Sequence, residues 1–212
     1  SILDPTIFSI AIYSKGGNAA GLAFFGFAFI LISRRYEFNR VPPLLWAGVL
    51  LLLISFVSTG HAQKAGPIAQ AVLSLHLVAI AFWLGSFFPL RQMCSSLEAG
   101  NLYKISERFG TLAIFYICLL LISGLVFAYI LIGDLSLLLS TIYGNIFLMK
   151  ITLVSLLLGL GALNKFRLVP LVKREPLIGA QRLRKSIQIE ILIALFILSL
   201  SGFLTTSTTL PM

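Results

Sequence analysis

The sequence predicts an all-α fold, a polytopic transmembrane helical bundle of about six transmembrane helices with the N-terminus and the C-terminus both outside (N-out and C-out). Of its 212 residues, 58% are apolar and only 11% are charged, whereas a soluble domain carries more charge. Six apolar segments approach the ~20 residues that a helix needs to cross a bilayer. The alternation of apolar and polar residues that is typical of barrel strands is absent, so helices are the expected spanning elements.

The expected spanning segments follow one another along the whole chain: residues 17–33, 42–60, 66–90, 108–132, 143–163 and 186–206. The first is short and rich in glycine and alanine over residues 16–21, which favours close packing against another helix. Residues 1–16 are too short to cross and are expected at the outer interface. Because the chain begins with serine rather than methionine, we expect that residues were removed from it or precede it.

Lysine and arginine fix the expected orientation of the helices. The loops after the first, third and fifth segments hold thirteen of them: Arg34, Arg35, Arg40, Arg91, Lys104, Arg108, Lys165, Arg167, Lys173, Arg174, Arg182, Arg184 and Lys185. The opposite side holds only Lys15 and Lys64. By the positive-inside rule the loops with thirteen cations are cytoplasmic, and a bacterial inner membrane is the expected location. The net charge of +9 therefore reflects topology rather than binding to nucleic acid.

His76 stands in the third segment, "LSLHLVAIAFWLGSFFPL" (residues 73–90), near the middle of the bilayer. An imidazole is costly in hydrocarbon unless a hydrogen-bond partner or a metal ion satisfies it. His76 is therefore interpreted either as a hydrogen-bonding residue between helices or as a ligand. Trp83, seven residues further on, shares its face and fits both interpretations.

Three further ionisable groups lie in or beside the apolar segments. His61 ends the second segment at the outer surface, and the tight turn around "QKAGP" predicts that the second and third helices are antiparallel neighbours. Lys150, in the outer half of the fifth helix, either snorkels outward or has a structural role. Glu190, near the inner end of the sixth helix, is a metal or proton site or an ion-pair partner of Lys185 or Arg184.

Copper suits these residues, because imidazole binds it in either oxidation state and thioether favours Cu(I). His61 and His76 differ in depth by ~10 Å, which suits two successive stations, with Met93 near the inner end. The same histidines permit a bis-His haem b subunit as an alternative, and a structural subunit of a larger copper-enzyme complex is a third hypothesis. Cys94 and Cys118 have no metal or disulfide spacing and are expected to be buried. No hydrolase or phosphate-loop motif is present, so no enzyme is predicted.

Five blocks of the sequence resemble, in the same order, the CopD/PcoD family of copper resistance membrane proteins. The blocks are "LHLVAIAFWLG" at 75–85, "ERFGTLAIF" at 107–115, "GDLSLLLSTIYGNIFLMK" at 133–150, "ALNKFRLVPLV" at 162–172 and "LRKSIQIEILIALFILSLSG" at 183–202. The resemblance runs from about His61, in "GHA" at 60–62, to Thr205. It is strongest at Thr141, Tyr143, Gly144 and Lys150 and at Asn164, Arg167 and Pro170.

The resemblance implies an inner-membrane protein that passes copper from the periplasm to the cytoplasm alongside a periplasmic CopC-like carrier. It marks His61 and His76 as candidate ligands. Met93 and Glu190, from their positions near the inner helix ends, are expected near the exit. Structural or gating roles fall to Trp83, Asp134, Thr141, Tyr143, Lys150, Asn164 and Arg167. Lys150 is expected to reach Asp134 or the hydroxyl of Tyr143, because a partner offsets part of its burial cost.

The resulting organisation has four parts. Residues 1–16 form a periplasmic or interfacial segment, residues 17–60 the first two helices, residues 61–206 a CopD-like core of four helices, and residues 207–212 a periplasmic tail. Members of the family often carry additional N-terminal helices. Expected partners are the lipid bilayer, the CopC-like carrier and other membrane subunits, but no nucleic acid.

Overall fold

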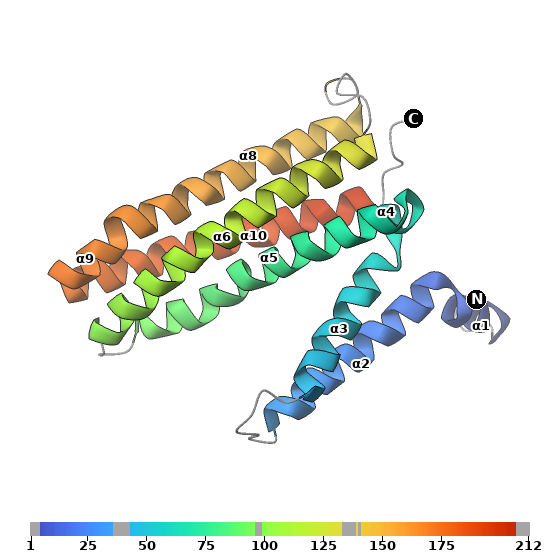
Figure 1. The fold of residues 1–212 in the computed structure, drawn as a ribbon, viewed down its shortest axis with the longest axis horizontal. Helices are drawn as coiled ribbons and strands as arrows, with labels where there is room; N and C mark the ends of the chain where they lie inside the picture. The colour runs from blue at the N-terminus through green and yellow to red at the C-terminus, as the bar shows by residue number, and fades with distance from the viewer. Residues whose placement is uncertain (1–4, 36–42, 96–98, 133–138, 140, 207–212) are drawn as a thin grey trace. The chain divides into compact units, whose positions relative to one another are not determined.

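The computed structural model describes residues 5–35, 43–95, 99–132, 139 and 141–206. All regular secondary structure in these ranges is helical. The helices are α1 (Pro5–Tyr13), α2 (Lys15–Arg35), α3 (Pro43–Val57), α4 (Gly60–Ala65), α5 (Pro67–Met93), α6 (Ala99–Ile132), α8 (Ile142–Leu163), the π-helical turn η1 (Asn164–Leu168), α9 (Val169–Arg174) and α10 (Pro176–Thr206) (Figure 1). The predicted fold class is confirmed. Two compact units meet within α5, residues 1–74 and residues 75–212, and each is described by itself.

In the first unit, α2 and α3 approach closely at a pair of glycines. A Cβ atom on Gly26 would lie 2.9 Å from the carbonyl oxygen of Gly48, and one on Gly48 would lie 2.7 Å from that of Gly26. The Ser55 hydroxyl adds a bond across the pair by donating to the carbonyl of Ala19 at 2.9 Å. Small residues thus allow the backbone contact that membrane helices use for association. The contact includes Ala19, within the stretch 16–21 that the sequence indicates, and extends to Gly26 beyond it.

The connection from α3 to α5 is a short helix rather than a bare turn. Gly60, the first residue of α4, and Gly66, which follows the helix, have φ angles of 72° and 95°, which glycine adopts without steric cost. Pro67 then starts α5, where its fixed φ suits the first helical position. The amide of Gln70 donates to the carbonyl of Val57 at 3.0 Å, tying the start of α5 to the end of α3.

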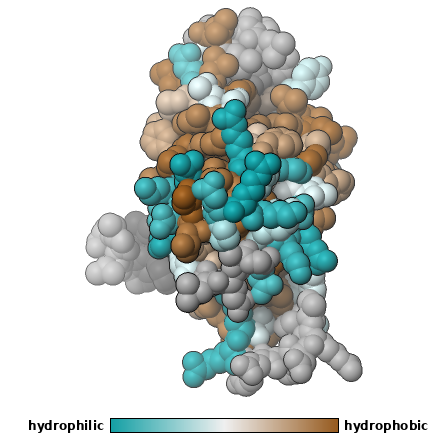
Figure 2. Space-filling model, turned by 90° about the vertical axis from the view of Figure 1, so that its left-hand side faces the viewer, coloured by the Kyte–Doolittle hydropathy of each residue, from teal (hydrophilic) through white to brown (hydrophobic). Residues whose placement is uncertain are grey.

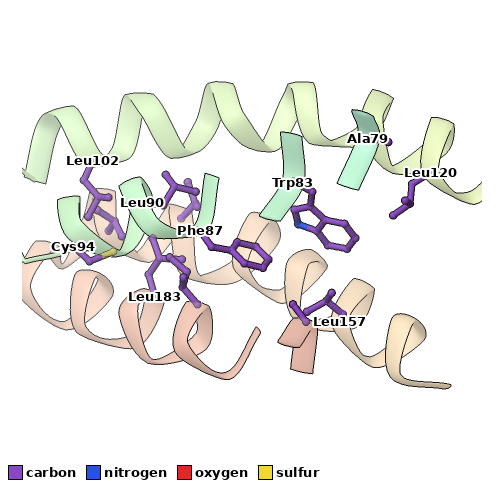
Figure 3. Packing of buried hydrophobic residues seen from close by; sticks show 13 residues of the cluster. Ala79, Trp83, Phe87, Leu90, Cys94, Leu102, Leu120, Leu157 and Leu183 are labelled. Carbon is purple, nitrogen blue, oxygen red and sulfur yellow. The ribbon is translucent and has the colours of Figure 1, made fainter. Parts of the chain in front are cut away.

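The second unit is a bundle of α6, α8, α9, α10 and the larger part of α5, and these helices run alongside one another (Figure 1). Its core is a continuous cluster of buried apolar side chains from all five helices. Figure 3 shows Trp83 and Phe87 pointing from α5 into the space between the helices, where Leu157 of α8 also lies. Burial of this apolar area stabilises the packing and fixes which face of each helix turns inward.

Several helices extend beyond the predicted segments. α6 begins at residue 99 rather than 108, α10 begins at residue 176 rather than 186, and η1 and α9 continue α8 to residue 174. Hydropathy detects only the part of a helix that lies in hydrocarbon, so charged helix ends were assigned to loops. Among the described residues, five helices are long and apolar enough to span a membrane. α3, with 15 residues, is shorter than the predicted segment 42–60.

The surface of the second unit separates apolar sides from a polar end. Large apolar side chains such as Phe115, Leu125 and Leu192 are more than 60% exposed along the helices, as expected for contact with lipid. Figure 2 shows hydrophilic residues gathered at the end where α9 lies. Exposed charged residues of these helix ends are Lys104, Glu107, Arg108, Arg167, Lys173, Arg174, Glu175, Arg182, Arg184 and Lys185. The long helices therefore end together in a cationic cap.

Candidate functional site: an intramembrane histidine and a polar cavity

His76 of α5 is held by the backbone of α6. Its Nδ1 atom lies 3.1 Å from the carbonyl oxygen of Leu120 and 3.2 Å from the hydroxyl oxygen of Ser123. A carbonyl oxygen can only accept, so we assign the ring proton to Nδ1, which donates to Leu120. The other ring nitrogen, Nε2, then carries a lone pair and has no hydrogen-bond partner among the described residues. A ring fixed in this way by a backbone carbonyl is the usual arrangement of a metal-binding histidine.

Two residues of α6 that the sequence analysis did not identify accommodate this ring: Gly124 leaves space for it and Ser123 accepts a hydrogen bond from it. A Cβ atom on Gly124 would lie 2.9 Å from Cε1 of His76, so the imidazole occupies the space that any larger residue would fill. Ser123 donates its own hydroxyl to the carbonyl of Leu119 at 2.6 Å, which leaves its oxygen to accept from His76. A serine–glycine pair inside an apolar run was the available signal.

Lys150 of α8 interacts electrostatically with His76. Its side chain is half-buried and forms no hydrogen bond or ion pair with another described residue. The expected partner Asp134 lies outside the described residues. A charged lysine in this position disfavours a second positive charge at His76.

Glu190 lies on the inner face of α10 and is 2% exposed. Its carboxylate accepts from Nδ2 of Asn164 and, at 3.5 Å, from the hydroxyl of Ser186. The sequence also allowed an ion pair with Arg184 or Lys185, but within the described part of the chain Glu190 forms no salt bridge, and both of those cations are exposed. Because α10 begins at Pro176, the carboxylate lies well inside the bundle rather than one turn from a helix end.

The π-helical turn η1 gives Asn164 its position. The N–H of Val169 donates to the carbonyl of Asn164, five residues earlier, instead of to the residue four earlier. Pro170 explains the wider turn, because its ring excludes the carbonyl four positions before it and it has no N–H to donate. The same turn directs Lys165 toward α6, where its ammonium group donates to the carbonyl of Gly110 at 2.6 Å. Single π turns inside helices are frequent at functional sites.

The residues around η1 border a cavity of about 240 Å³. Its walls are mostly apolar and include Trp83 and Phe87. Four polar side chains also line it: Ser106, Asn164, Lys165 and Glu190. Among the described residues, the Ser106 hydroxyl and the Oδ1 atom of Asn164 are buried without a hydrogen-bond partner. No sequence pattern distinguishes Ser106, since serine is common in membrane helices.

The other candidate residues have diverse surroundings. Met93 ends α5 half-buried against the apolar cluster, and Trp83 is 4% exposed inside that cluster. Thr141 precedes α8 and its hydroxyl accepts from the N–H of Gly144 at 3.0 Å. Tyr143 is buried against Leu204. Arg167 is exposed on η1, and His61 is half-buried on α4 of the first unit.

The cysteines differ from each other. Cys94 is buried and Cys118 is exposed, so the expectation that both are buried is wrong for Cys118, which faces outward from α6. Burial raises the pKa of the Cys94 thiol to about 11, against a smaller opposite effect of Arg184. Cys94 is therefore a neutral thiol near pH 7, whereas the thiolate is the metal-binding form.

No preformed metal cluster unites the candidate ligands. Within the described ranges, no three side chains of the His, Cys, Asp and Glu types come together. His61 belongs to the first unit and His76 to the second. The described part of the second unit instead contains two distinct polar features: the Nε2 atom of His76 on α5, and a mostly apolar cavity lined by a few polar side chains of α6, η1 and α10.

Residues 103–204 match the family model described as Copper resistance protein D. The family resemblance is thereby confirmed over those residues, which include Asn164, Glu190 and the block from Thr141 to Lys150. The match does not extend to His61 or His76, for which the resemblance stays a prediction. Neither the curated proteins nor the solved structures contain a match to the chain.

Proposed function

We propose, from the match of residues 103–204 to the copper resistance protein D family, that this chain accepts copper at the periplasmic side of a bacterial inner membrane and passes it toward the cytoplasm. The observation that carries the proposal is the state of His76. Its Nδ1–H is committed to the Leu120 carbonyl, and its Nε2 lone pair is left for an ion. Imidazole is a ligand for copper in both oxidation states.

The proposed path begins at His61, continues at His76 and ends near Met93 and Glu190. A CopC-like carrier supplies the ion at the outer side. Lys150 limits the affinity of His76 for copper without abolishing binding, because its charge opposes a cation there. Trp83, Asp134, Thr141, Tyr143, Asn164 and Arg167 position the helices or gate the path. Movement is passive or driven by capture of copper in the cytoplasm.

The proposed orientation rests on the cationic cap. α5 ends, α6 begins, α8 continues into α9 and α10 begins at this end of the second unit. Exposed lysine and arginine at helix ends are retained on the cytoplasmic side of a membrane. The cap therefore supports a cytoplasmic location for Met93 and a periplasmic location for the opposite helix ends.

Elemental analysis tests the proposal. The protein, purified in mild detergent from copper-supplemented cells, is expected to contain about one copper per chain, and His76→Asn is expected to lose it. Asparagine can still donate to the Leu120 carbonyl but lacks the second ring nitrogen, so this variant separates ligand loss from misfolding. Ser199→Ala, which removes a hydroxyl bonded within α10, is the control. His61→Ala is expected to slow loading without removing the central site.

Two outcomes contradict the proposal. Copper content and cellular copper accumulation that are unchanged in His76→Asn would remove His76 from the path. Iron near one per chain with a Soret absorption band would identify a bis-His haem b subunit instead. Neither metal, together with stable co-purification of other membrane subunits, would favour the structural role.

A further inference from the structure

The cavity of the second unit has more hydrogen-bond acceptors than donors. Asn164 directs its Nδ2 donor to Glu190, which fixes its Oδ1 atom as an acceptor on the other side of the amide. That Oδ1 atom is buried with no donor among the described residues. Ser106, only 4% exposed, lines the same cavity with an unpartnered hydroxyl. Buried polar atoms of this kind are costly unless something satisfies them.

The charged groups of the cavity are already engaged. Lys165 donates to the carbonyl of Gly110, and Glu190 accepts from Asn164 and Ser186. The two groups left over are neutral oxygens, a hydroxyl and an amide carbonyl. Oxygen ligands are poorly matched to Cu(I), which prefers nitrogen and sulfur. Asn164 Oδ1 can only accept, whereas the Ser106 hydroxyl can accept or donate. A neutral molecule that donates a hydrogen bond would therefore meet the unmet requirement.

The walls and rim of the cavity indicate how such a molecule would arrive. Two lining residues, Ile114 of α6 and Phe166 of η1, are 49% and 71% exposed on the apolar side of the bundle. The neighbouring side chains of Leu112 and Phe115 are also exposed, so lipid covers this side. The cavity is thus partly open toward the bilayer, close to the cationic cap where the hydrocarbon region ends.

We propose that this cavity binds a bilayer-dissolved molecule with a hydroxyl head on an apolar body, with the head at Ser106 and Asn164 and the body against Trp83 and Phe87. The volume of about 240 Å³ exceeds the ~150 Å³ of an engineered apolar cavity that binds benzene. An apolar pocket with a few convergent polar groups is the general form of a small-molecule site. The site is separate from His76, but its lining includes Trp83, Asn164 and Glu190, which the proposed copper path also uses.

Trp83 provides a direct measurement, because the chain has only two tryptophans and Trp83 lines the cavity. In a Trp46→Phe background, 4-bromophenol is added to the full-length protein in mild detergent. Bromine quenches indole emission at contact, so a saturable loss of Trp83 fluorescence is expected. 4-Bromoanisole has the same ring but cannot donate a hydrogen bond, and it is expected to bind at least tenfold more weakly.

Three variants complete the test. Ser106→Ala removes the hydroxyl and Ala113→Leu fills the cavity from α6; both are expected to weaken 4-bromophenol binding at least tenfold while the protein keeps its unfolding temperature. Ser199→Ala, outside the cavity, is expected to bind as the parent does. Absence of quenching would overturn the proposal. Equal quenching by both compounds, or quenching that survives Ser106→Ala or Ala113→Leu, would also overturn it and would indicate partition of the compounds into detergent.

Discussion

His76 and the cavity at Glu190 solve the same problem, a polar group inside a membrane bundle, in different ways. His76 uses a backbone carbonyl of α6, so one ring nitrogen is satisfied and the other is left for a ligand. Glu190 uses side chains of η1 and α10, and the network leaves unpartnered oxygens rather than a nitrogen. The difference separates the ligand chemistry of the two places: nitrogen suits copper, and neutral oxygen suits a hydrogen-bond donor.

α6 and α8 contribute to both places. α6 holds His76 through Leu120 and Ser123 and lines the cavity through Ser106. α8 carries Lys150 near His76 and continues directly into the turn that positions Asn164. Substitutions that act on one place and spare the other can therefore establish whether the two are independent.

The largest effect on stability is expected from Asn164→Leu. The replacement keeps the approximate volume but removes the donor to a buried carboxylate, a loss of about 2–3 kcal/mol for a hydrogen bond to a charged group. The free energy of unfolding, measured by denaturant titration in detergent, gives the value. In a Glu190→Leu background the same substitution should cost much less. An equal cost in both backgrounds would show that the Asn164–Glu190 bond contributes nothing.

Gly124→Ala should disturb His76 and leave the cavity intact. The new methyl group would lie 2.9 Å from the imidazole, and overpacking of this kind costs about 1–3 kcal/mol. Copper content should fall together with the unfolding free energy. Gly159→Ala is the matched control, because a Cβ atom there meets nothing within 4 Å, and it should stabilise α8 by about 0.5–1 kcal/mol. Unchanged copper content in Gly124→Ala would show that the ring tolerates displacement.

The reactivity of Cys94, just after the end of α5, tests whether a thiolate is available as a metal ligand at this end of the second unit. With its pKa raised to about 11, the thiol is protonated at neutral pH and its alkylation rate should rise about tenfold per pH unit. The rate is followed by mass spectrometry in a Cys118→Ala variant. An ordinary cysteine would reach its plateau near its usual pKa of about 8.5. A plateau at that pH would mean that Cys94 is accessible to water and available as a copper ligand.

Thr141→Ala should have the smallest effect on the unfolding free energy. It should affect His76 and the cavity equally, because α8 contributes to both. It removes the hydroxyl that accepts from the N–H of Gly144 at the start of α8, which costs about 1 kcal/mol for a helix cap. Thr152→Ala is the control, because that exposed hydroxyl bonds only to Leu148 inside the helix. If the two threonine variants have the same unfolding free energy, the cap does not stabilise α8.

The sequence predicted the features that belong to one helix at a time. Apolar length identified the spanning segments, and cation counts located the polar helix ends, because both properties depend only on contact with lipid or water. His76 and Glu190 could be recognised as unusual from their cost in hydrocarbon alone. The starts of α6 and α10 were missed, since a charged helix end outside the hydrocarbon has the composition of a loop.

The bonds that define the two places required the tertiary structure. His76 meets Leu120 across 44 positions of sequence, and Asn164 meets Glu190 across 26. A backbone carbonyl has no signature in sequence, and a serine or glycine in a membrane helix fits many packing arrangements. The periodicity of one helix shows which face is apolar, but only packing between helices decides which polar atoms find partners and which, like Ser106 and Asn164 Oδ1, are left without one.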